Sequence, residues 1–134
     1  MTGRMIFLSL PVSDLPIARA FYEGLGFRIN EYSSDDRTAS AVVDENIVVT
    51  LQTRERFAEL AGGEAGEPSR PTAVPCLTVD DRAEVDDLVS KALAGGGREW
   101  LPAQEEASRY TGSFTDPDGN VWQVMWLDQL HVVN

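Results

Sequence analysis

The same succession of sequence patterns occurs twice along the chain, and this internal repeat restricts the possible folds more than any other feature. The triplet Val12-Ser13-Asp14 precedes an amphipathic segment at residues 15–25, and Val79-Asp80-Asp81 precedes another at residues 82–93, an offset of 67 residues (79 − 12). Each triplet ends in an aspartate suited to cap a helix, and glycines follow both segments, as helix C-termini favour. The repeat predicts two helices in corresponding positions of two similar modules.

Strand-like segments surround each predicted helix. One apolar segment precedes each helix, at residues 5–12 and 72–79, and three shorter segments follow it. The shorter segments lie at residues 27–32, 38–43 and 47–53 in the first half and at residues 98–102, 110–115 and 121–127 in the second. The order of one strand, one helix and three strands therefore occurs twice, which predicts an α+β fold of two tandem βαβββ modules.

A segment with the composition of a linker separates the two halves. Residues 61–71, AGGEAGEPSRP, are rich in glycine, glutamate and proline and offer few apolar groups to bury. We predict a single domain over residues 1–134, made of module one at 1–60, the linker at 61–71 and module two at 72–134. Each module is too small to bury much apolar surface alone, so the modules are expected to pack together or to pair with another chain.

The charge and the hydropathy of the chain restrict its partners. A net charge of −11 argues against binding to nucleic acid and to anionic membranes, because both repel such a surface. No apolar run approaches the roughly 18–20 residues of a membrane span. The short apolar run near the N-terminus is not followed by a cleavage site of small residues, so we expect a cytoplasmic protein. The single cysteine, Cys76, is expected to be a buried and unreactive thiol.

Two stretches of sequence carry a resemblance to a known family. These are LPVSDLPIARAFYEGLGF at residues 10–27 and FTDPDGNVWQVMW at residues 114–126, with weaker support from residues 77–97. Over nearly its whole length the chain resembles the vicinal oxygen chelate superfamily, which includes glyoxalase I, fosfomycin- and bleomycin-resistance proteins and extradiol dioxygenases. The resemblance implies that the strands form an open cup with the helices on the outer face. It also implies a homodimer, because two-module chains of this superfamily commonly pair so that modules of different subunits complete each cup.

The enzymes of this superfamily hold one divalent metal ion in the cup with four side chains, one on the first and one on the last strand of each module. Carried over to this chain, these positions are Phe7, Val74, Gln123 and Val49, where Val49 is taken as the repeat mate of Gln123 at an offset of 74 (123 − 49). None of the four offers the imidazole, carboxylate or thiolate that a divalent first-row metal needs. We therefore expect neither a metal ion nor another cofactor. The only histidine, His131, lies beyond the last predicted strand.

Alternation along the strands extends the set of residues expected to face the cup. This set is mostly apolar and contains no general base of the histidine or carboxylate kind. Its members are Phe7, Ser9, Ile47, Val49, Leu51, Val74, Cys76, Thr78, Val121, Gln123 and Met125. Among them, Ser9, Thr78 and Gln123 are expected to orient a ligand, and Trp100 and Tyr110 lie where they could form the rim. The alternative is a filled cup in which Gln123 bonds to a neighbour and Trp100 and Tyr110 are packing residues.

The favoured hypothesis is a metal-free protein that binds a small organic molecule, aromatic or cationic, in a mostly apolar cup. Apolar walls supply affinity in such pockets, and a few polar groups orient the ligand. Two alternatives stay open. One is a glyoxalase-like lyase or a dioxygenase that uses a divalent metal, and the other is a structural or interaction protein with a closed cup. Whether the chain catalyses a reaction is not decided by these patterns.

Overall fold

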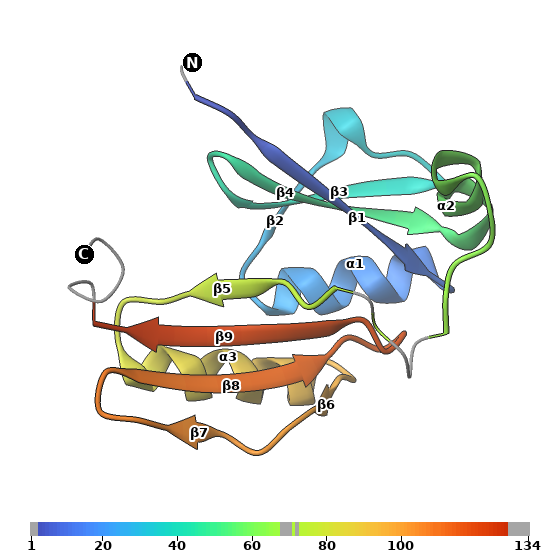
Figure 1. The fold of residues 1–134 in the computed structure, drawn as a ribbon. Helices are drawn as coiled ribbons and strands as arrows, with labels where there is room; N and C mark the ends of the chain where they lie inside the picture. Colours follow the sequence, from blue (N-terminus) through green and yellow to red (C-terminus); the bar gives the residue numbers. More distant parts are fainter. Residues whose placement is uncertain (1–2, 68–70, 72, 129–134) are drawn as a thin grey trace. The chain divides into compact units, whose positions relative to one another are not determined.

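The computed structural model describes residues 3–67, 71 and 73–128 (Figure 1). The chain divides into two compact units, Met1–Glu67 and Pro68–Asn134, and the boundary between them falls within the predicted linker. Each unit contains the order of one strand, one helix and further strands, so the predicted α+β fold with a repeated βαβββ module is confirmed. None of the helices in the described residues combines the length and hydropathy of a membrane-spanning helix. His131 lies outside the described residues.

Module one is built on a four-stranded sheet in the order β1-β4-β3-β2. Strand β1 runs parallel to β4, and the other neighbours are antiparallel. A short 3-10 helix follows β2 at Glu31–Ser33, and helix α2 follows β4 directly. The elements are β1 (Ile6–Val12), α1 (Leu15–Gly24), β2 (Arg28–Asn30), β3 (Thr38–Asp44), β4 (Ile47–Thr53) and α2 (Arg54–Ala61).

Helix α1 covers one face of this sheet. It begins where the Asp14 carboxylate accepts a hydrogen bond from the backbone N–H of Ile17 at 3.0 Å, as an N-cap does. Its apolar stripe is buried and contacts β3 and β4, and the strand residues with 0% exposure are Ala39, Ala41, Val49 and Leu51. Apolar helix and apolar sheet face thus bury one another. The other side of the sheet is called the distal face of module one.

Module two repeats this plan with a shorter first strand. Its sheet has the order β5-β9-β8-β6, β7 also pairs with β8, and β5 runs parallel to β9. The strand predicted from residue 72 begins only at Cys76, because Pro75 has no N–H to give to a ladder; residue 72 lies outside the described residues. The elements are β5 (Cys76–Thr78), α3 (Arg82–Ala94), β6 (Arg98–Glu99), β7 (Gln104–Glu105), β8 (Arg109–Thr115) and β9 (Val121–Leu127).

Helix α3 lies very close to the sheet of module two. A Cβ atom added at Gly112 of β8 would lie 3.0 Å from Cγ1 of Val85 and 3.0 Å from Cγ2 of Val89. Gly112 therefore marks the helix-covered face, and its ladder partner Val124 is 0% exposed. Residues one position away along β8 and β9, such as Gln123, point to the opposite side. That side is called the distal face of module two.

Candidate functional site

The strand register shows which residues reach the distal face of module one. Parallel pairing places Phe7 beside Val48 and Ser9 beside Thr50, and paired residues share a face. Val49 and Leu51 therefore lie on the α1 side, where both are 0% exposed. The prediction that Ile47, Val49 and Leu51 share the face of Phe7 and Ser9 is wrong.

Turn length explains this error. Ser9 pairs with Thr50 as Cys76 pairs with Gln123, and Ser9 and Cys76 are 67 residues apart (76 − 9). The repeat mate of Gln123 is therefore Thr50, at an offset of 73 (123 − 50). In module one the last pair before the turn is Asp44 and Ile47, and the register shifts in β3 just before it. In module two the last pair is Thr115 and Val121, so a longer turn, residues 116–120, joins β8 to β9. A one-residue change in register moves every side chain to the other face.

The distal face of module one carries polar groups that bond to one another. The Ser9 and Thr50 hydroxyls lie 2.7 Å apart, and the Thr38 hydroxyl donates to Oε1 of Gln52 at 2.5 Å. The Ser40 hydroxyl donates to a backbone carbonyl 3.1 Å away. The expectation of a mostly apolar surface is wrong for this face, because Thr50 and Gln52 stand where Val49 and Leu51 were expected.

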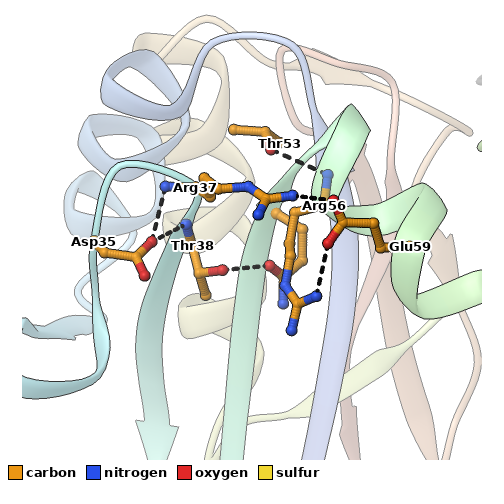
Figure 2. Close-up of polar contacts among 7 residues, drawn as sticks. Asp35, Arg37, Thr38, Thr53, Arg56 and Glu59 are labelled. Carbon is orange, nitrogen blue, oxygen red and sulfur yellow. Dashed lines mark hydrogen bonds and ion pairs between the residues drawn. The ribbon is translucent and has the colours of Figure 1, made fainter.

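An ion cluster at one end of this sheet fastens α2 and the turn before β3 (Figure 2). Glu59 of α2 pairs with both Arg37 and Arg56, and hydrogen bonds from these guanidinium groups lower the pKa of its carboxyl. Asp35 accepts hydrogen bonds from the backbone N–H groups of Arg37 and Thr38, which lower the pKa of Asp35. These contacts are local, and the positive and negative charges balance. We therefore interpret the cluster as structural, because it joins α2 to the turn before β3.

The distal face of module two brings several predicted residues together. Cys76, Gln123 and Ser113 form one row across three strands, and Thr78, Met125 and Thr111 form the next. The alternation that placed Cys76, Thr78, Gln123 and Met125 on one face is thus confirmed, while their binding roles stay predictions. Val74 is 42% exposed and lies two residues before β5.

Cys76 corrects one expectation about this face. The cysteine is exposed, not buried as predicted, because its side of the sheet is not the side covered by α3. Partial burial of the sulfur nevertheless raises the pKa of the thiol, so the protonated form dominates at neutral pH. A protonated thiol is a poor nucleophile, and no residue of the part that the structure describes forms a hydrogen bond with Cys76 as a general base would.

Gln123 differs from Asn30 and Gln52 of module one, whose side-chain oxygens accept hydrogen bonds. Its backbone N–H donates to the carbonyl of Pro75 at 2.8 Å, which holds β9 beside the segment leading into β5. The side chain is half-buried, and its amide forms no hydrogen bond within the described part of the chain. Its neighbour Ser113 is engaged, because that hydroxyl accepts from the N–H of Leu101 at 2.9 Å. The two N–H donors and the carbonyl acceptor of the Gln123 amide therefore remain unbonded by the described residues.

Trp100 and Tyr110, both expected near a rim, lie on different sides of the sheet. Trp100 follows β6, and its N–H donates to the carbonyl of Ser113 at 3.2 Å. Tyr110 pairs with Trp126 on the α3 face, so its side chain lies on the side of the sheet opposite to Gln123. Its hydroxyl donates to Asp86 at 2.6 Å, which raises the pKa of the phenol.

A hollow of about 560 Å³ opens beside Trp100 at one end of the second sheet. Its walls come from β6 and from the turn that joins β8 to β9, and the lining residues are Arg98, Glu99, Trp100, Thr115, Asp116, Pro117, Asp118 and Gly119. Asp116 is only 2% exposed, and its carboxylate accepts from the backbone N–H groups of Asp118 and Asn120. Asp116 therefore builds the turn, and the hollow is shaped by a rigid wall.

Sequence reasoning missed Thr50, Gln52, Thr111 and Ser113. The two residues of β8 had a readable signal, because RYTGSFT alternates polar and non-polar positions from Arg109 to Thr115 and so indicates one polar face. Thr50 and Gln52 had none, because only the ladder reveals that module one lacks the longer turn of module two.

The corrected set of positions still does not fit a metal ion. With Thr50 in place of Val49, the four positions implied by the resemblance are Phe7, Thr50, Val74 and Gln123. Two hydrocarbon side chains, one hydroxyl and one amide do not form the donor set of a divalent first-row metal. Among the described residues, no group of three histidine, cysteine or acidic side chains is arranged to hold one.

Comparisons with known proteins agree with this architecture. Residues 4–124 match the family model of the Glyoxalase/Bleomycin resistance protein/Dioxygenase superfamily. No curated protein sequence matches the chain. Among solved structures, a hypothetical protein from S. aureus is similar, with 25% identity, 94% of each chain covered and a TM-score of 0.78. An enzyme of the superfamily from Burkholderia phytofirmans PsJN has 20% identity, covers 94% of this chain and 100% of its own, and has a TM-score of 0.79. The fosfomycin resistance protein FosX from Mesorhizobium loti has 17% identity, full coverage of both chains and a TM-score of 0.70.

Proposed function

Because this chain belongs to the Glyoxalase/Bleomycin resistance protein/Dioxygenase superfamily, we propose that it binds a small organic molecule on the distal face of module two, with Gln123 orienting the ligand. The observation that carries the proposal is the half-buried Gln123 amide, which has no hydrogen bond to the described residues. No buried side-chain nitrogen or oxygen among the described residues lacks a partner, so the unbonded amide atoms of Gln123 are accessible from solvent and a ligand can reach them.

The surroundings of Gln123 support binding more than catalysis. The adjacent side chains are Cys76, Ser113, Thr78 and Met125, which are uncharged. The Cys76 thiol has a raised pKa and is mostly protonated at neutral pH. A surface of this kind recognises neutral polar groups and apolar surface, but it offers no acid–base pair for proton transfer.

The proposed binding requires no metal ion. The positions implied by the resemblance, with Thr50 replacing Val49, have no imidazole, carboxylate or thiolate donors. Elemental analysis of protein purified without chelators tests this part, and we expect only substoichiometric zinc, nickel, manganese or iron. A stoichiometric metal would overturn it and favour a lyase or a dioxygenase instead.

The pairing of two chains stays a prediction that light scattering tests.

A thermal-shift screen tests the binding itself. The wild-type protein is heated with a panel of small organic cations, aromatic compounds and neutral metabolites, with and without EDTA. We expect at least one compound to raise the melting temperature equally in both conditions, since binding to the native state stabilises it. In Gln123→Leu the affinity for that compound should fall about 5- to 30-fold, the equivalent of one lost hydrogen bond of about 1–2 kcal/mol.

The matched control is Ser90→Ala, a change to an exposed polar residue of α3 on the other side of the sheet. This variant should bind the compound as the wild type does. The proposal fails if no compound in the panel shifts the melting temperature, or if Gln123→Leu binds the compound as tightly as Ser90→Ala.

A further inference from the structure

We propose that the hollow beside Trp100 takes a flat organic cation, so that the ligand of the distal face carries a positive charge about 10 Å from the group that Gln123 holds. This inference rests on the proposed function and names the chemical class of its ligand. It depends on three observations, namely the size of the hollow, the chemistry of its walls and its position relative to Gln123.

The hollow has the size of a small-molecule site. Its volume of about 560 Å³ lies within the range of roughly 300–1,000 Å³ found for ligand pockets. One wall is formed by β6 and Trp100, and the other by the turn from Thr115 to Gly119. In Figure 1, β6 and the turn between β8 and β9 lie at the same end of the sheet. Hydrogen bonds from Asp118 and Asn120 to Asp116 make that second wall rigid. A preformed wall lowers the entropic cost of binding.

The chemistry of the walls favours a cation with a flat or compact apolar body. Trp100 is 40% exposed, so its indole presents aromatic surface to the hollow. Among aromatic side chains, tryptophan binds cations best. The lining also contains three acidic residues, Glu99, Asp116 and Asp118, against one basic residue, Arg98. The net charge of the chain, −11, adds a long-range attraction for cations.

Trp100, which lines the hollow, lies in the same sheet as the row that contains Gln123. The Trp100 N–H bonds to the Ser113 carbonyl, and Ser113 pairs directly with Gln123. Trp100 and Gln123 are therefore two strand spacings apart, which is about 10 Å. A ligand of drug-like length can place a cationic group in the hollow and a carbonyl or hydroxyl group at Gln123.

The test uses three aromatic probes of similar size and different charge: phenyltrimethylammonium, benzyl alcohol and benzoate. Their binding to the full chain is followed by the indole N–H signals of the three tryptophans in NMR spectra, with the Trp100 signal assigned from a Trp100→Phe variant. We expect phenyltrimethylammonium to shift the Trp100 signal with a dissociation constant on the order of 1 mM, as befits so small a fragment. Benzyl alcohol should bind more weakly and benzoate most weakly of the three.

Variants separate the contribution of the ring from that of charge. Trp100→Leu should weaken binding of phenyltrimethylammonium about 3- to 10-fold, whereas Trp100→Phe should keep most of the affinity. Glu99→Gln should weaken it about twofold. Glu45→Gln is the matched control, because it removes the same charge from an exposed turn of module one. Equal losses in Glu99→Gln and Glu45→Gln would mean that the overall charge acts and not the hollow, which would overturn the proposal.

Two further outcomes also overturn it: benzoate binding more tightly than phenyltrimethylammonium, or Trp100→Leu binding the cation as tightly as the wild type. Failure here is distinct from failure of the proposed function. A neutral compound whose affinity depends on Gln123 but not on Trp100 would leave the proposed function intact and refute the cationic class. Binding of the cation that depends on Trp100 but not on Gln123 would leave a cation site in the hollow and refute the role proposed for Gln123.

Discussion

The two modules have the same fold, but their distal faces treat polar groups differently. In module one the Ser9 and Thr50 hydroxyls meet at 2.7 Å, and the Thr38 hydroxyl bonds to Gln52. In module two the residue that corresponds to Thr50 is Gln123, whose amide has no such bond within the described residues. The polar side chains of the first face bond to one another, whereas the Gln123 amide of the second face forms no hydrogen bond to the described residues.

This difference separates a face that stabilises its own sheet from a face that we propose binds a ligand. Hydrogen bonds between strand side chains stabilise a sheet, each by about 0.5–1.5 kcal/mol, so the face of module one contributes mainly to stability. The face of module two lacks that contribution at Gln123, where we propose that a ligand binds. The helix-covered sides differ as well. Ala39 of module one pairs with Leu51 as Gly112 of module two pairs with Val124, so an alanine stands in the first module where a glycine stands in the second. An added Cβ atom at Gly112 would lie 3.0 Å from side chains of α3.

The largest effect is expected at this helix contact. Gly112→Ala places a Cβ atom 3.0 Å from Val85 and Val89, whose β-branched side chains have little freedom to move within a helix. We expect the free energy of unfolding to fall by about 1–3 kcal/mol, measured by chemical denaturation. Gly24→Ala is the control and should be neutral or slightly stabilising, because a Cβ atom added there meets nothing within 4 Å beyond its chain neighbours and its own helix backbone. Equal stability of Gly112→Ala and wild type would show that α3 does not depend on the missing side chain.

The central contrast is tested by replacing one amide in each module. Gln52→Leu leaves the Thr38 hydroxyl without its acceptor in a largely buried place, so it should lower the free energy of unfolding by about 1–2 kcal/mol. Gln123→Leu removes no hydrogen bond to the described residues and should change it by less than about 0.5 kcal/mol. Chemical denaturation of both variants gives the comparison. A loss for Gln123→Leu as large as that for Gln52→Leu would make Gln123 a structural amide and remove the contrast.

The smallest effect concerns acid stability in module one. Backbone hydrogen bonds from Arg37 and Thr38 lower the pKa of Asp35 below its ordinary 3.8 (Figure 2). A carboxyl whose pKa is lower in the folded state stabilises the fold above pH 3.8, and this contribution disappears as the pH falls through the lowered pKa. Asp35→Asn should therefore show a shallower fall in melting temperature between pH 5 and pH 3 than the wild type.

Asp36→Asn is the matched control for this experiment. It removes the same charge one residue away, from a carboxylate that accepts no hydrogen bond among the described residues. Its melting temperature should follow the wild-type profile. If the melting temperatures of Asp35→Asn and Asp36→Asn both fall with pH as steeply as that of the wild type, the hydrogen bonds to Asp35 do not contribute to acid stability.

Much of the fold was predictable because its signals are local. The caps at Asp14 and Asp81, the apolar stripes that follow them and the turn at residues 116–120 all lie within a few residues of the elements they define. Alternation along β9 likewise placed Gln123 and Met125 on one face. The strand expected at residues 98–102 is shorter, since β6 ends at Glu99 and the N–H of Leu101 bonds to a side chain of β8.

The sequence by itself determined the repeated βαβββ plan, the two capped helices and the absence of metal-binding side chains at the positions implied by the resemblance. Only the tertiary structure decided that Val49 lies under α1 and Thr50 on the distal face, because register depends on ladder hydrogen bonds between strands some 40 residues apart in the chain. It also decided that Tyr110 bonds to α3 and that Trp100 borders a hollow with the turn at Asp116. Such contacts join residues that are distant in sequence, so periodicity along one strand does not specify them.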